Sequence, residues 1–153
     1  MSIWHPDIEE FITAKQTPGR LTRFNMSVLV TDDFMEAVKE HKPWKLFYPD
    51  YDEDKELYNH YWNGDINTWM TIGGSFKVYK EYADANELWD LIMKSTYLRN
   101  EPGVLFVDTI NRMNNLYYCE HITASNPCGE QPLPVGAVCL LGALNLTQFI
   151  SIS

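Results

Sequence analysis

The chain has 153 residues, of which 45% are hydrophobic and 14% aromatic, which is enough for one domain with a buried core and argues against disorder. Its net charge of −9 disfavours direct binding to nucleic acid and to anionic membranes, because basic patches hold both. Three cysteines without a C-x-x-C pair are no disulfide framework and indicate a reducing, cytoplasmic location. We expect no signal peptide and no membrane span, because the apolar runs are too short.

Helical and strand patterns alternate in the first part of the chain. Residues 8–15 carry apolar side chains at helical spacing and follow a Pro-Asp pair that suits a helix start. Residues 24–30 read as a strand, and its continuously apolar second half is typical of a buried parallel sheet. The segment Thr31-Asp-Asp33 is expected to cap the helix that follows, which reaches about Lys39.

The middle of the chain is less regular. Residues 44–48 and 76–79 have the composition of short strands. Between them, residues 50–75 begin with an acidic, tyrosine-rich stretch without periodicity, so we predict a surface insertion with solvated charges. The tryptophans and tyrosines of residues 58–69 and the imidazole of His60 are expected to pack rather than to bind a cofactor.

The clearest helix follows a capping box at Asp84-Ala-Asn-Glu87 and ends near Arg99. Residues 104–107 then form a second strand of the buried type, and residues 109–125 read as a long polar loop. This order of elements predicts the α/β class. In such folds catalytic loops lie beyond the carboxyl ends of strands, so the segment after residue 107 is where we look for chemistry.

The segment Asn126-Pro-Cys-Gly-Glu130 combines an amide, a thiol and a carboxylate. In an extended backbone alternate residues share one face, so Asn126, Cys128 and Glu130 would point the same way. The amide donates and accepts hydrogen bonds, and the carboxylate can take a proton from a hydroxyl. The thiol can act as nucleophile, metal ligand or radical. A plain Pro/Gly turn with an incidental cysteine explains the same five residues.

A zinc site is the alternative use of the cysteines. Cys119, His121, Cys128 and Cys139 would supply four ligands, but they lack the paired spacing of structural zinc motifs. We therefore predict no metal site.

Five blocks give the chain a resemblance to the catalytic subunit of ribonucleotide reductase, and they span nearly its whole length. They are His5-Pro-Asp-Ile-Glu-Glu-Phe-Ile, Asn25-Met-Ser-Val, Glu101-Pro-Gly-Val-Leu-Phe-Val-Asp108, Asn126-Pro-Cys-Gly-Glu130 and Leu141-Gly-Ala-Leu-Asn-Leu146. The sequence around residue 128 looks most like that of the adenosylcobalamin-dependent class, although some enzymes that use a metal-radical partner subunit have a similar sequence there. The resemblance implies that residues 1–153 are about half of a ten-stranded α/β barrel, without its N- and C-terminal parts but with the catalytic finger loop.

The resemblance also implies roles for four residues. Cys128 matches the cysteine whose thiyl radical abstracts the 3′ hydrogen of the ribonucleotide substrate. Glu130 matches the carboxylate that takes the 3′-hydroxyl proton, and Asn126 matches the amide that binds substrate hydroxyls. Cys139 matches one of two redox cysteines that end as a disulfide, which thioredoxin or glutaredoxin reduces. Its partner cysteine would precede Met1.

Two functions follow as expectations. In the first, the chain is a fragment of a reductase that makes deoxyribonucleotides for DNA replication, inactive until it joins the remaining reductase segments and a possible second copy. In the second, it is a noncatalytic remnant or assembly module of a split reductase. The complete set Asn126, Cys128, Glu130 and Cys139 favours the first, because a relic has no chemical reason to keep all four.

Overall fold

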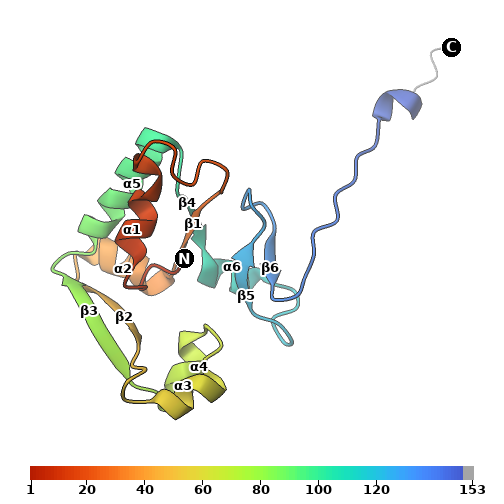
Figure 1. The fold of residues 1–153 in the computed structure, drawn as a ribbon. Helices are drawn as coiled ribbons and strands as arrows, with labels where there is room; N and C mark the ends of the chain where they lie inside the picture. The colour runs from red at the N-terminus through yellow and green to blue at the C-terminus, as the bar shows by residue number, and fades with distance from the viewer. Residues whose placement is uncertain (150–153) are drawn as a thin grey trace.

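The computed structural model describes residues 1–149, in which helices and short strands alternate (Figure 1). The helices are α1 (Ile8–Thr13), α2 (Asp32–Glu40), α3 (Lys55–Tyr61), α4 (Ile66–Thr71), α5 (Asn86–Arg99) and α6 (Val107–Met113), with 3-10 turns at Ala14–Gln16 and Leu146–Phe149. The strands are β1 (Ser27–Val30), β2 (Trp44–Pro49), β3 (Phe76–Tyr82), β4 (Gly103–Phe106), β5 (Ile122–Ser125) and β6 (Pro132–Pro134). The mixed α/β class is confirmed, but within residues 1–149 the strands form three separate pairs and no closed barrel.

The central pair is β1 and β4, which are parallel and in register from Ser27 opposite Gly103 to Val30 opposite Phe106. Both strands expected from the sequence therefore form and are adjacent. Only β1 is of the buried type, because the residues of β4 are partly or fully exposed. On its other side β1 contacts the first residues of the chain, because the Ile3 amide donates to the Leu29 carbonyl at 2.9 Å. β1 is thus the middle of this small sheet.

The core lies where α1, α2 and α5 pack on β1. Its fully buried apolar side chains come from all four elements and from the N-terminal segment: Ile3, Ile8, Val28, Val30, Phe34, Leu88 and Ile92. Burying such a side chain stabilises the fold by about 1.5–3 kcal/mol. In Figure 1, α1 and α5 lie side by side on one face of the sheet.

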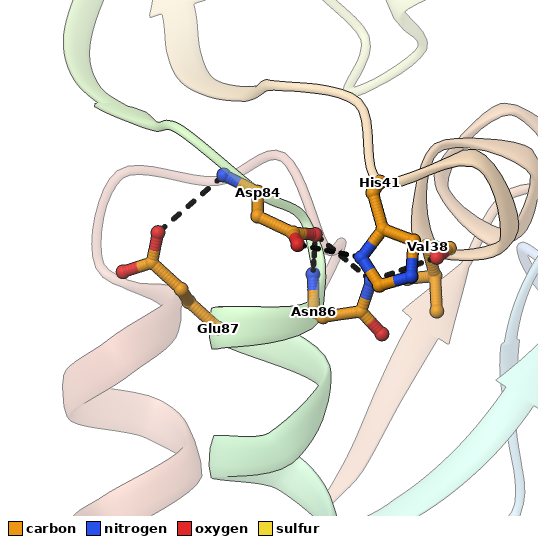
Figure 2. A network of polar contacts seen from close by, with 5 residues as sticks. All are labelled: Val38, His41, Asp84, Asn86 and Glu87. Atoms are coloured by element: carbon orange, nitrogen blue, oxygen red, sulfur yellow. Dashed lines mark hydrogen bonds and ion pairs between the residues drawn. The ribbon is translucent and has the colours of Figure 1, made fainter.

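A polar network joins the end of α2 to the start of α5 (Figure 2). Nδ1 of His41, which adopts a left-handed conformation after α2, lies 2.7 Å from Oδ2 of Asp84. Asn86 donates from Nδ2 to the carbonyl of Val38 at 2.7 Å. The capping box is only partly as predicted. As expected, the Asp84 amide donates a hydrogen bond to the carboxylate of Glu87, at 3.4 Å. The carboxylate of Asp84, however, accepts a hydrogen bond from the amide of Asn86, at 2.8 Å, and not from that of residue 87. α5 accordingly begins two residues after Asp84.

The second pair, β2 and β3, is antiparallel and confirms the two short strands expected in the middle of the chain. Between them the aperiodic residues 50–75 fold into α3 and α4. The side chain of Asp65 caps α4 by accepting the amides of Asn67 and Thr68, at 3.0 and 3.3 Å. Trp69 is buried, and its ring meets those of Tyr58 and Trp62 edge to face. These aromatic residues pack on one another, as expected.

Residues 109–125 are not the long loop that the sequence predicted. α6 covers their first part and β5 their last, and only the segment around Leu116 remains a turn. Asn111 explains the difference, because its side chain accepts the Ile122 amide at 2.8 Å and donates to the Ile122 carbonyl at 2.9 Å. A polar side chain here ties a helix to a strand, so the polar composition did not mean an irregular segment.

After β6 the chain runs away from the rest of the molecule in an extended line (Figure 1). This segment exposes large apolar side chains: Val135, Val138, Leu140, Leu141, Leu144, Leu146 and Phe149. Leu140, at 94% exposure, is the extreme case. Exposed apolar surface of this extent is unusual for a soluble monomer and marks a contact surface. None of the helices formed by residues 1–149 combines the length and the apolar character needed to span a bilayer.

Candidate active site

The segment around Cys128 is the tip of the hairpin formed by β5 and β6, next to α6 (Figure 1). The Gly129 amide donates to the Asn126 carbonyl at 3.0 Å, which closes a tight turn. Gly129 has φ +80°, a conformation that residues with a Cβ rarely adopt. Gln131 closes the base of the turn, because its amide donates to Oδ1 of Asn126 at 3.0 Å and its carbonyl accepts the Asn126 amide at 3.1 Å.

The extended backbone expected for this segment is therefore wrong. Pro127 and Gly129 favour a turn, and the chain reverses between Asn126 and Gln131. The three side chains do not share a strand face: Asn126 is half-buried at the base, whereas Cys128 and Glu130 are exposed. The Asn126 carbonyl oxygen Oδ1 is already engaged, which leaves its Nδ2 group as the donor for a ligand.

The thiol of Cys128 has a partner that the sequence reasoning missed. Nδ2 of Asn25, directly before Met26 and β1, donates to Sγ of Cys128 at 3.9 Å. The signal was present in the block Asn25-Met-Ser-Val, where an exposed asparagine precedes a buried strand. The contact joins two segments that are far apart in the sequence.

Cys139 lies on the other side of the turn. Its thiol donates to Oε1 of Gln131 at 2.6 Å, so the same glutamine binds the turn through its backbone and Cys139 through its side chain. Cys119 lies elsewhere, with its Sγ 3.5 Å from the Leu116 carbonyl oxygen. All three cysteines are free thiols.

A cavity of about 410 Å³ opens beside the turn. It lies between the residues that lead into β1, one side chain of β4 and the β5 end of the hairpin. The cavity has a polar and an apolar part. Its polar lining consists of Arg23, Asn25, Ser27, Thr123, Ser125 and Asn126, and Phe11, Phe24 and Leu105 are among its apolar residues. A space of this size, with an apolar wall and a few convergent polar groups, suits a small organic ligand.

The structure thus brings Asn126 and Cys128 together at one turn and adds Asn25 to them. Glu130 follows on the same turn with an exposed carboxylate, and Cys139 is linked to the turn through Gln131. Within residues 1–149, no three side chains of His, Cys, Asp or Glu gather closely enough to hold a metal ion. The four ligands of the zinc alternative are accordingly not assembled.

Fold and turn together define an α/β protein in which a hairpin presents a thiol beside a polar-lined cavity. A family model described as "Ribonucleotide reductase, barrel domain" matches residues 1–153. The chain belongs to this family, which confirms the resemblance found in the sequence.

Curated relatives agree with this family. The chain is 36% identical, over 99% of its length, to a "Vitamin B12-dependent ribonucleoside-diphosphate reductase" of Mycobacterium tuberculosis, and the match covers 18% of that protein. A protein of the same name from Thermoplasma acidophilum is 35% identical over 95% of the chain and 16% of its own length. The "Ribonucleoside-diphosphate reductase subunit alpha" of Helicobacter pylori is 31% identical over 85% of the chain and 17% of its own length. The chain spans less than a fifth of these relatives.

Proposed function

We propose that the chain is a central part of a ribonucleotide reductase catalytic subunit and takes part in reducing ribonucleotides to deoxyribonucleotides. In this proposal residues 1–153 contribute about half of a ten-stranded α/β barrel, residues 50–75 are a surface insertion, and the β5–β6 turn is the finger loop. The family membership and the intact set of four functional side chains support it. The names of the relatives suggest a ribonucleoside diphosphate as the substrate.

The proposed chemistry begins at Cys128. As a thiyl radical its sulfur takes the hydrogen atom from C3′ of the ribose, so an S–H bond forms, a C–H bond breaks and the unpaired electron moves to C3′. Glu130 accepts the 3′-hydroxyl proton as a general base, and its exposed position leaves it free to do so. Asn126 donates from Nδ2 to a substrate hydroxyl and holds the sugar over the sulfur.

The 2′ hydroxyl then leaves as water, and two electrons and two protons come from a pair of thiols that become a disulfide. Cys139 is one of the pair in this proposal, and the second cysteine belongs to reductase sequence outside this chain. The hydrogen first taken from C3′ returns from Cys128, which regenerates the thiyl radical. A thioredoxin or glutaredoxin reduces the disulfide for the next turnover, in a cytoplasm that keeps thiols reduced.

The radical source is proposed to be adenosylcobalamin, because two relatives are named as vitamin B12-dependent. When bound, this cofactor would supply a radical that takes the hydrogen atom from a thiol. The residues present fit such a source in one respect: the Cys128 sulfur is exposed at the tip of a turn and accessible from outside the chain. A metal-radical partner subunit, as the alternative source, would use the same accessible sulfur.

The observation that carries the proposal is that Asn126, on the turn of Cys128, and Asn25, which donates to the Cys128 thiol, both line a cavity of about 410 Å³. The test is to combine the chain with the remaining segments of the reductase and to assay deoxyribonucleotide formation with adenosylcobalamin and a thioredoxin system. We expect Cys128→Ala to abolish turnover and Cys119→Ala to retain it. Full activity of Cys128→Ala would disprove the thiyl assignment.

A noncatalytic assembly module is the second candidate, and the extended apolar segment after β6 favours it. Seven large apolar side chains between Val135 and Phe149 are exposed, which suits a segment that packs against other reductase polypeptide or a second copy of the chain. The two candidates separate in the same assay. If reassembled enzyme with intact Cys128, Glu130 and Cys139 binds its partner segments but makes no product, the chain is a noncatalytic assembly module.

A further inference from the structure

Asn25 is the one residue whose side chain reaches the sulfur of Cys128 within the described part of the chain. It also lines the same cavity as Asn126 and Pro127. The asparagine therefore touches both the thiol and the space beside it.

The backbone around Asn25 is held in place from two sides. The ammonium group of Lys15 donates to the carbonyl of Phe24 and pairs with the carboxylate of Glu101, so it links the entries of β1 and β4. The amide of Gly103 donates to the carbonyl of Met26 at 2.8 Å. Hydrogen bonds thus hold the backbone on both sides of Asn25, one from the Lys15 side chain and one from β4.

Cys128, in contrast, belongs to an exposed turn. The hydrogen bonds of this turn are made by its backbone and by Asn126, and they do not restrict rotation about the Cα–Cβ bond of the cysteine. An exposed cysteine has three staggered rotamers open to it. A donor from Asn25 selects the rotamer in which the sulfur lies over the start of β1.

The proposed hydrogen-atom transfer depends on the rotamer of Cys128. A sulfur that accepts an N–H on one side directs its S–H bond, or the singly occupied orbital of a thiyl radical, away from that donor. Hydrogen-atom transfer requires the reacting atoms to be aligned and in contact, so a freely rotating sulfur would be productive for only part of the time.

We propose that Asn25 is a positioning residue that holds the Cys128 side chain in one rotamer through the Nδ2–Sγ hydrogen bond. The inference rests on the proposed function only for the purpose of that rotamer, because the contact itself can be measured without turnover. It gives the block Asn25-Met-Ser-Val a role within the site.

The first experiment uses the full chain labelled with ¹³C and ¹⁵N. Three-bond couplings to the Cβ hydrogens report the χ1 rotamer of Cys128. We expect couplings of a single rotamer in the parent and averaged couplings in Asn25→Leu, which keeps the approximate shape of the side chain without its donor. Asn115→Leu is the matched control, because Asn115 is exposed and lies in the turn after α6, away from the thiol. Unchanged single-rotamer couplings in Asn25→Leu overturn the proposal.

A reciprocal variant keeps the test decisive if Asn25→Leu disturbs the sheet, which the amide shifts of Val28 and Leu105 would show. Cys128→Ala removes the acceptor and leaves Asn25 in place. We expect the Nδ2 hydrogens of Asn25 to exchange with solvent about two- to tenfold faster in that variant, the range for loss of one neutral hydrogen bond. Equal exchange rates contradict the contact.

In the reassembled reductase, Asn25→Leu should lower kcat by about two- to tenfold and leave KM unchanged. Asn25→Gln, which retains a donor, should recover part of the loss. A rise in KM with unchanged kcat would instead make Asn25 a substrate contact and overturn the positioning role. If Cys128→Ala retained turnover while the rotamer result held, the proposed function would fail and the Asn25 contact would remain.

Discussion

The side chain of Asn111 binds both backbone groups of Ile122. It accepts the Ile122 amide at 2.8 Å and donates to the Ile122 carbonyl at 2.9 Å, and its Nδ2 also reaches the carbonyl of Val107 at 3.0 Å. One half-buried side chain therefore ties the start of the β5–β6 hairpin to α6. Ile122 itself is buried, so its amide and carbonyl have little access to water as substitutes.

Replacing Asn111 with alanine should loosen the hairpin. The change leaves two buried backbone groups without partners, which costs about 1–3 kcal/mol. Hydrogen exchange measured by NMR should show faster exchange of the Ile122 amide and a lower free energy of unfolding. Asn115→Ala, an exposed site, serves as the control and should change neither. Equal protection of Ile122 in both variants would contradict the role of Asn111.

Gly129→Ala should strain the turn that carries Cys128. A Cβ at this position would meet only Cδ2 of Leu105, at an ordinary 3.6 Å, so the penalty comes from the backbone conformation at φ +80°. That penalty is about 1–2 kcal/mol for a residue with a Cβ. Gly136→Ala is matched, because it has φ +84° and nothing near its Cβ, but it lies beyond β6. We expect the Gln131 amide to lose protection in Gly129→Ala only.

Asp84→Ala should reduce stability at neutral pH and leave it unchanged in strong acid. The hydrogen bond from the Asn86 amide, followed by the contact with His41, lowers the pKa of Asp84 to about 2. Because the folded-state pKa is below that of the unfolded chain, about 3.9, the ionised carboxylate stabilises the fold above that value. This contribution is lost as the pH falls from about 4 through 2. Asp90→Ala, an exposed site on the same helix, is the control.

Urea unfolding at pH 7, 4 and 2 measures this prediction. The difference between Asp84→Ala and the parent should shrink steadily over that range, whereas Asp90→Ala should follow the parent at each pH. A difference that stays constant to pH 2 would show that the carboxylate charge does not stabilise the α2–α5 junction.

Ile92→Ala should destabilise the core of the described domain. Ile92 is fully buried on α5, and removing its side-chain atoms leaves a cavity that costs about 2–5 kcal/mol. Tyr97→Ala on the same helix removes a larger side chain that is 88% exposed, and it should change the unfolding free energy by less than about 0.5 kcal/mol. Thermal unfolding of the two variants tests whether the loss of stability depends on the burial of the side chain and not on its size.

The sequence predicted the elements whose signal is local. The apolar run ending at Val30 and the run after Pro102 predicted the two adjacent strands, although the second is not buried. The helix through Ile92 followed from its spacing. α6 was missed because its residues are polar and its order depends on Asn111 reaching Ile122, a contact between two elements. Periodicity within one segment carries no information on such a contact.

The same distinction between local signals and contacts between distant segments applies to the candidate site. Asn126, Cys128 and Glu130 were singled out because they occupy one short motif, and Cys139 because of the resemblance to the family. Asn25 lies about 100 positions earlier, and its role depends on the fold bringing β1 beside the hairpin. The turn at Gly129 was one of two alternatives that the sequence left open, indicated by its Pro and Gly residues, and it is the one that the structure shows. The other alternative, an extended strand face, is wrong.

The pairing of β1 with β4 has a kinetic consequence. Ser27 and Gly103 are neighbours in the sheet, yet about half of the chain lies between them. The two strands can pair only when the intervening chain forms a closed loop, which costs conformational entropy. Contacts of such long sequence separation slow folding. β2 and β3 lie closer to each other in the sequence, so we expect this antiparallel pair to order first. The sheet that holds Asn25 against Cys128 is then completed last, and the thiol acquires its surroundings only in the finished fold.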